Sequence, residues 1–275
     1  MNFTIFGAKG FIGSNLVSYL RSRGHSVLAP EREEILGLKV NLGHVVYAIG
    51  MTGNFRSKPF ETVEAHTNIL SQLLRAYNFD SWLYLSSSRL YGLSNRSCSE
   101  EDRINVFPAK DGVYDISKLL GEALCLSMQR PTVRVARLSN VYGVGQSKHT
   151  FLGDIFKNLY LHEDVEIRES PISSKDYIDI SDVVKMIEQI ALRGKYNIYN
   201  IASGYNTKHI DIASMIQNTL NVKASFKPNS KDRVFSKINI QRIKDDFSFE
   251  PQDIKHNFPK VLKKIINDPD WNCND

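Results

Sequence analysis

The chain has few cysteines, no long apolar run and no recognisable secretion signal. Its 275 residues include only 3 cysteines and 9 prolines. Cys98, Cys125 and Cys273 have neither the spacing of a metal site nor the even number of a disulfide framework. No apolar run approaches the roughly twenty residues of a membrane span, and the apolar opening lacks the charged leader of a secretion signal. We therefore expect a protein of the reducing cytoplasm, with no metal and no membrane partner.

Strong charge of either sign is also missing. The formal net charge is +5, and the lysines and arginines are dispersed rather than gathered on one helix. This distribution argues against nucleic acid as a partner, whereas small anionic substrates remain compatible. With 42% hydrophobic residues, the chain is long enough for one large core and a smaller lobe.

A glycine-rich turn stands at the start of the chain. Residues 2–6 form a short apolar run suited to a buried parallel strand, and a helical repeat of apolar residues follows. Gly7 permits a tight turn, Gly10 allows close approach of a ligand, and Gly13 lets the helix lie on the sheet. A dinucleotide diphosphate binds at such a helix N-terminus. The candidate cofactor contacts in this turn are Gly7, Lys9, Gly10, Phe11, Ile12 and Gly13.

Tyr114 and Lys118 form a second motif. They stand four residues apart at the head of a segment whose Leu119, Leu120, Ala123 and Leu124 predict an amphipathic helix. An ammonium group beside a phenol favours the phenolate, so we expect Lys118 to lower the pKa of Tyr114 from its usual ~10. Such a tyrosine can move a proton while a nicotinamide, bound beside both residues, moves hydride. The alternative is an ordinary surface pair at i and i+4.

Hydroxyl groups gather at the end of another predicted strand. Residues 82–85 form an apolar run that leads into Ser86, Ser87 and Ser88. Ligands of α/β proteins bind at the carboxyl ends of strands, where a serine can hydrogen-bond the reacting oxygen.

Together these motifs resemble the extended short-chain dehydrogenases/reductases of the nucleotide-sugar, NAD-dependent epimerase/dehydratase family. The resemblance covers nearly the whole chain and includes the runs at residues 87–92, 137–143 and 175–182. It implies an α/β fold, with a Rossmann-like doubly wound parallel sheet and a small α+β substrate lobe. It also assigns the catalytic serine to Ser87, four residues before Tyr91, beside Tyr114 and Lys118.

The resemblance further implies substrate contacts. Asn140 would contact the sugar nucleotide, Lys175 replaces an arginine that binds the diphosphate, and Arg233 is a second diphosphate contact or an ordinary surface arginine. Ser88 and Arg89 stand where sugar dehydratases carry Asp-Glu. They are expected to face the substrate, and they argue against a 4,6-dehydratase.

The cofactor type stays open. Glu31, after a predicted strand at residues 26–29, aligns with the acid that binds the adenosine ribose of NAD, whereas the adjacent Arg32 suits the phosphate of NADP. Ala48, Ile49 and Gly50, at and just after the end of the next core strand (residues 45–49), are further candidate cofactor contacts. Only about a dozen residues separate Glu31 from this strand, too few for the usual helix, third strand and second crossover. We predict that one βα unit is missing, that adenine is exposed and that cofactor affinity is low.

His66 replaces a usual family asparagine in a helix predicted to begin near Val63. We interpret this histidine as structural rather than catalytic. In the loop of residues 51–59, Arg56 and Lys58 are weaker candidates for contact with substrate charge.

Two units are expected. Residues 1–143 and 177–202 would form the dinucleotide-binding domain, and residues 144–176 and 203–275 the substrate-binding lobe, with helices around Ile212 and Leu262. The resemblance also implies a homodimer formed through the helices of Leu70 and Leu120.

The leading functional prediction is an NAD or NADP enzyme that reduces a nucleotide-linked 4-keto sugar, with Tyr114 as proton donor. A 4-epimerase that retains NAD would use the same three residues. A dinucleotide-sensing regulatory protein is the alternative from another class, although such proteins usually lose the tyrosine and lysine pair. By resemblance alone, a role in polysaccharide or glycosylated-metabolite synthesis follows.

Overall fold

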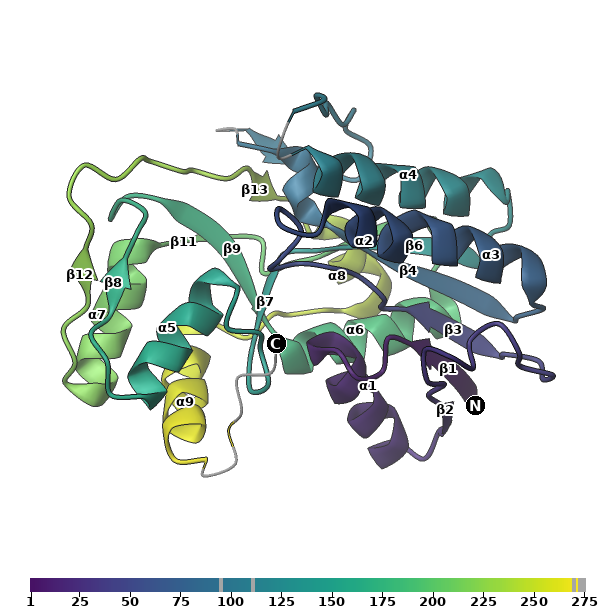
Figure 1. The fold of residues 1–275 in the computed structure, drawn as a ribbon, viewed down its shortest axis with the longest axis horizontal. Helices are drawn as coiled ribbons and strands as arrows, with labels where there is room; N and C mark the ends of the chain where they lie inside the picture. Colours follow the sequence, from purple (N-terminus) through teal and green to yellow (C-terminus); the bar gives the residue numbers. More distant parts are fainter. Residues whose placement is uncertain (94–95, 110–111, 269–270, 272–275) are drawn as a thin grey trace.

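A six-stranded parallel sheet forms the centre of the computed structural model, which describes residues 1–93, 96–109, 112–268 and 271 (Figure 1). The strand order is β2-β1-β3-β4-β6-β10. The strands are β1 (Asn2–Phe6), β2 (Ser26–Leu28), β3 (His44–Tyr47), β4 (Ser81–Ser87), β6 (Val133–Leu138) and β10 (Ile198–Ile201). All five pairings in this sheet are parallel, so the carboxyl ends of the strands share one edge.

Helices cover both faces of this sheet, as predicted (Figure 1). One face carries α1 (Phe11–Ser22), α6 (Ile180–Arg193) and α8 (Gln241–Phe247), and the other carries α2 (Pro59–Val63), the π-helical segment η1 (Glu64–Asn68), α3 (Ile69–Ala76) and α4 (Val113–Ser127). Each face has its own apolar core, and β6 is buried along its whole length. Burial on both faces explains the nearly continuous apolar runs of the central strands.

The sheet is short at the β2 edge, which confirms the predicted loss of a βα unit. No helix or strand occurs among residues 29–43, all of which the structure describes. Ile35 and Leu42 fill the core beneath this segment. The Tyr77 hydroxyl donates a hydrogen bond to Ile35 O (2.8 Å) and accepts one from Leu38 N (3.1 Å). A few buried side chains and one tyrosine therefore hold the shortened connection, and β2 is left as the edge strand.

A second group of elements packs beside the carboxyl edge of the sheet (Figure 1). It includes the sheet β11-β9-β7 and a separate apolar cluster beneath three helices. Its elements are β7 (Asn140–Tyr142), α5 (Phe151–Tyr160), β8 (Glu166–Ile167), β9 (Ser174–Asp179), β11 (Asn206–Lys208), α7 (His209–Leu220), β12 (Ser225–Phe226) and α9 (Ile254–Ile266). Short segments η2 (Ser88–Tyr91), β5 (Ser97–Cys98) and β13 (Lys237–Ile238) lie near the junction.

Several predicted details were wrong. The helix expected to begin near Val63 begins at Pro59. In α4, Leu120 is 50% exposed and Ala123 is also exposed, whereas the buried face carries Tyr114, Lys118 and Glu122. The polar residues of α4 thus point inward and part of its apolar surface is free.

The structure also bears on membrane spans and on the state of the cysteines. Within the described ranges, no helix is both long and apolar enough to cross a membrane. Cys98 and Cys125 are free thiols, and Cys273 lies outside the described residues.

Candidate active site

The turn between β1 and α1 has no room for side chains at two of its glycines. Gly7 has a positive φ of 87°, and a Cβ there would lie 2.7 Å from Ala48 C. A Cβ at Gly13 would lie 2.1 Å from Gly7 O. Gly10, the N-cap of α1, leaves the amide groups of the first turn without a side-chain cap. This cradle fits a dinucleotide diphosphate, which binds exposed amide groups at the positive end of a helix.

Lys9 and Glu31 face each other beside this turn. Lys9 Nζ lies 2.6 Å from Glu31 Oε2, and both side chains are largely exposed. The hydrogen bond and charge of Glu31 raise the pKa of Lys9. Arg32 is exposed as well. Glu31 and Arg32 therefore both lie at the surface beside this turn, and the cofactor stays NAD or NADP.

The predicted cofactor segments meet the predicted catalytic residues at the end of β3. Ala48 N donates to Phe6 O (2.8 Å), which joins the segment to β1. A Cβ at Gly50 would lie 3.4 Å from both His66 Nε2 and Lys118 Nζ. Ile49 packs against the core beneath α3. Phe11 and Ile12, at the head of α1, pack on the opposite core.

Ser87, Tyr114 and Lys118 come together at the carboxyl edge of the sheet. Ser87 ends β4, and Tyr114 and Lys118 share the buried face of α4. The Ser87 side chain lies close enough to the Tyr114 hydroxyl to influence its pKa. Lys118 Nζ donates to Leu85 O (2.8 Å) in the same strand. The three residues predicted from separate motifs therefore form one constellation.

The predicted direction of the Tyr114 pKa was wrong. Burial raises the pKa of Tyr114, because an apolar environment disfavours phenolate, and the neighbouring Ser87 side chain and the Arg89 charge only partly oppose this. Lys118 is not a cause of the shift, and burial lowers the pKa of Lys118 itself to about 7. Tyr114 is thus protonated at neutral pH.

His66 has a structural position, as interpreted from the sequence. It is fully buried in η1, and burial with the charge of Lys118 lowers its pKa to about 2. Met51 N donates to His66 Nε2 (3.2 Å), so the neutral ring carries its proton on Nδ1 and donates to Ser117 Oγ (2.8 Å). The Ser117 hydroxyl donates in turn to Tyr114 O (3.0 Å). His66 therefore links the 51–59 loop to the backbone of Tyr114.

Arg89 and Phe55 cover Tyr114. The Phe55 ring lies 5.0 Å from the Tyr114 ring, and the Arg89 guanidinium lies 5.7 Å from the centre of the Tyr114 ring. Arg89 Nε is bound by Asp115 Oδ1 at 2.8 Å. Ser88, half-buried, opens η2 beside them. Nothing in the sequence pattern signalled the role of Phe55, which comes from the 51–59 loop.

The other predicted substrate residues lie in the second group of elements. Asn140 is exposed on β7, and its Nδ2 donates to Asp176 O (2.8 Å). Lys175 Nζ and Arg233 Nη1 both approach Glu169 Oε1, at 2.9 and 3.7 Å. Lys175 and Arg233 therefore converge, but they do so on Glu169, an acid that was not among the predicted site residues.

A buried polar network lies behind the constellation. Arg137 Nη2 lies 2.7 Å from Glu122 Oε2, and Glu122 also accepts from Ser86 Oγ (2.6 Å). Arg137 Nη1 donates to the Tyr91 hydroxyl (3.0 Å). The i+4 spacing of Glu122 from Lys118 could have signalled its position on the inner face of α4.

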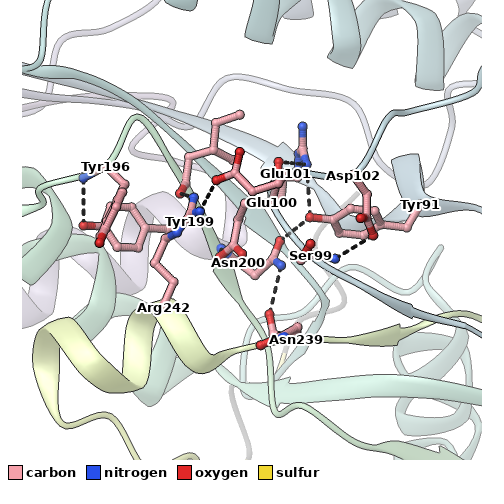
Figure 2. Close-up of polar contacts among 12 residues, drawn as sticks. Tyr91, Ser99, Glu100, Glu101, Asp102, Tyr196, Tyr199, Asn200, Asn239 and Arg242 are labelled. Atoms are coloured by element: carbon pink, nitrogen blue, oxygen red, sulfur yellow. Dashed lines mark hydrogen bonds and ion pairs between the residues drawn. The ribbon is translucent and has the colours of Figure 1, made fainter.

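Figure 2 follows the same network away from the constellation. The Tyr91 hydroxyl donates to Asn200 Oδ1 (2.8 Å), and Asn200 Nδ2 donates to Asn239 O (3.0 Å). A cavity of about 290 Å³ lies here, and none of the predicted site residues lines it. The network ties β4, β6 and β10 together near their carboxyl ends.

The fold and this constellation define a dinucleotide-dependent oxidoreductase of the short-chain dehydrogenase/reductase type. Residues 3–202 match the NAD dependent epimerase/dehydratase family, and the chain belongs to it. It is 24% identical to dTDP-4-dehydro-6-deoxy-D-allose reductase of a Streptomyces species, covering 91% of this chain and 92% of that one.

Solved structures agree in fold. UDP-glucose 4-epimerase of Thermotoga maritima, solved with UDP-glucose, has a TM-score of 0.84 at 18% identity, covering 96% of this chain and 98% of that one. MoeE5 in complex with UDP-glucose and NAD has a TM-score of 0.80 at 22% identity, covering 97% of each chain.

Proposed function

We propose that the protein reduces a nucleotide-linked 4-keto sugar with NADH or NADPH. The observation that carries the proposal is the meeting of Ser87, Tyr114 and Lys118 at the carboxyl edge of the sheet, where Tyr114 is buried. A group that is protonated before the reaction suits the reductive direction, which consumes a proton at the carbonyl oxygen. The curated reductase relative supports the same direction.

The proposed chemistry divides among three residues. A bound nicotinamide would supply the hydride. Ser87 orients and polarises the substrate carbonyl, and Tyr114 gives its proton to the carbonyl oxygen. Lys118, held by Leu85 O, lies where it can bind the cofactor ribose. Phe55 and Arg89 shield this position from water, which strengthens each polar interaction within it.

Neighbouring features separate reduction from related reactions. Elimination of water needs acids at positions 88 and 89, where this chain has Ser88 and Arg89, and Asp115 binds Arg89. An epimerase retains its cofactor, whereas a reductase must exchange it after each turnover. The short β2 edge supports exchange, because less protein is available to cover adenine.

The remaining assignments complete the proposal. Asn140, Lys175 and Arg233 would bind the sugar nucleotide between the dinucleotide domain, residues 1–143 and 177–202, and the substrate lobe, residues 144–176 and 203–275. We place the enzyme in the cytoplasm, as a homodimer, in the synthesis of polysaccharide or of glycosylated metabolites.

The first experiment follows nicotinamide absorbance with NADH or NADPH and a panel of nucleotide-linked sugars, with products resolved by chromatography. Stoichiometric oxidation by a 4-keto-6-deoxy sugar is expected. Interconversion of unmodified sugars without net oxidation of NADH or NADPH would show that the protein is a 4-epimerase instead. Cofactor binding with no turnover of any sugar would favour the regulatory alternative.

A further inference from the structure

Glu169 lies between Lys175 and Arg233, at the place where the proposed function expects the substrate diphosphate. Its Oε1 lies 2.9 Å from Lys175 Nζ and 3.7 Å from Arg233 Nη1. Lys175 is buried, whereas the Arg233 side chain is 51% exposed. A buried ammonium without a counter-ion is costly, and the Glu169 carboxylate offsets that cost in the unliganded protein.

The other Glu169 oxygen is not satisfied. Oε2 is buried and has no hydrogen-bond partner in the described part of the chain, and the same holds for His209 Nδ1, 3.7 Å away. His209 is fully buried, stacked on Phe151 at 4.1 Å, and its Nε2 lies 3.3 Å from the Tyr177 hydroxyl. If the Tyr177 hydroxyl donates to Nε2, the free proton of the ring lies on Nδ1 and faces Glu169.

This cluster lies within electrostatic reach of the catalytic constellation. Burial lowers the pKa of Lys175, and the charges of Arg233 and Arg89 lower it further, while Glu169 raises it. Arg89 is the residue that covers Tyr114.

We infer that Glu169 is a displaceable counter-ion, which the substrate diphosphate replaces at Lys175 and Arg233 and which then bonds His209 Nδ1. The inference rests on the proposed function. A diphosphate offers several charged oxygens to both cations and outcompetes one carboxylate, whereas a neutral or singly charged ligand gains little over it. Glu169 would thus favour ligands that carry a diphosphate over ligands with less negative charge, which is a role in specificity rather than in catalysis.

Calorimetric binding of UDP and dTDP tests the inference without a sugar substrate. Glu169→Gln should bind at least one nucleotide about fivefold or more tightly than the parent, because the competing charge is gone. Glu166→Gln, an exposed acid on the preceding strand, should bind like the parent.

Three outcomes would overturn the inference. Unchanged or weaker diphosphate binding by a folded Glu169→Gln would remove the competing role and leave the proposed function intact. No binding of either diphosphate to parent or variant would remove the proposed substrate class as well. If the variant does not fold, a structure of the parent with UDP or dTDP decides. Glu169 Oε1 still on Lys175 beside a bound diphosphate would contradict displacement, and Glu169 bonded to His209 Nδ1 would support it.

Discussion

The Tyr114 hydroxyl is the atom on which the proposed chemistry depends. Tyr114→Phe removes the proton but keeps the ring that packs on Phe55, so the fold and the cofactor site should persist. We expect turnover to fall by about 10²–10⁴-fold, the usual contribution of a positioned acid, with little change in cofactor affinity. Nicotinamide oxidation and calorimetric binding measure the two effects. Turnover at the parent rate would show that another group supplies the proton.

Lys118 is the residue with the clearest effect on stability. Burial lowers its pKa to about 7 in the folded protein from 10.5, the value that the unfolded chain keeps. Between these pH values the unfolded chain binds one more proton than the folded protein, so the free energy of unfolding rises with pH from about 7 to 10.5. Below pH 7 Lys118 is charged in both states, and the folded protein bears the full cost of burying the charge. Lys118→Met should raise Tm at pH 7 by about 3 °C or more and flatten this rise.

Scanning calorimetry across pH 6–10 checks the Lys118 prediction. Lys263→Met, an exposed lysine of α9, should leave both Tm and its pH dependence unchanged. A Lys118→Met protein that melts below the parent at pH 7 would show that the ammonium stabilises the fold through Leu85 O. If the expected result is found, the enzyme tolerates an unfavourable buried charge for the sake of its site.

The sequence predicted which residues would meet but not their electrostatics. Tyr114 and Lys118 were found from their spacing on one helix, and Ser87 was singled out among three serines by the family resemblance. The Tyr114 pKa was predicted in the wrong direction because its burial depends on Phe55 and Arg89, which approach from other segments. Glu169 was missed for the same reason, since only the fold brings it to Lys175.

Among the elements, the helical stretch from α2 to α3 has the most unusual geometry. It contains the π-helical segment η1, and such segments are often found at functional sites. His66 in this segment accepts from Met51 N and donates to Ser117 Oγ. His66→Leu would leave a donor and an acceptor unpaired, so we expect a loss of about 2–4 kcal/mol in the free energy of unfolding and weaker cofactor binding.

Chemical denaturation with calorimetric binding measures the His66 effect. His256→Leu, on the exposed face of α9, is the matched control and should change neither quantity. Unchanged stability of His66→Leu would mean that the 51–59 loop does not depend on this ring. Because the pKa of His66 is about 2, its protonation should not contribute to any pH dependence of activity between pH 5 and 8.

Elements were predicted well where apolar periodicity decides burial. The strands β1 and β4 and the helices α7 and α9 follow it. In α4 it failed, because the inner face is polar and serves the site, and Leu120 is exposed. The helix α5 was not predicted at all, although Thr150 caps it through Gly153 N. Apolar pattern alone cannot distinguish a core face from a face that remains available to a partner.

At the scale of the whole molecule, the short sheet edge should make the cofactor exchangeable. We expect freshly purified protein to carry less than one equivalent of dinucleotide and to bind it with a Kd above about 1 μM, in keeping with a cofactor used as a substrate. Chromatography of the nucleotide released on denaturation, followed by calorimetry, provides the measurement. A full equivalent of NAD that survives gel filtration would contradict exchange and favour the 4-epimerase.

The exposed apolar face of α4 is a candidate surface for pairing with a second copy of the chain. Ile116 and Leu120 are 41% and 50% exposed there, and α2 alongside exposes Phe60 and Val63. A stable dimer needs about 800 Å² of such surface from each partner. If two copies pair through these helices, Leu120→Arg places a charge in the buried centre and should weaken the dimer by about 30-fold or more.

Sedimentation analysis across a concentration series would measure that change, with Leu161→Arg, an equally exposed leucine at the end of α5, as the control. The parent and the control should sediment as dimers where Leu120→Arg is monomeric. A monomeric parent at micromolar concentration, or a Leu120→Arg variant that remains dimeric, would exclude pairing through α4. Because α4 carries Tyr114 and Lys118 on its opposite face, loss of the dimer should also lower turnover, which the same preparations would reveal.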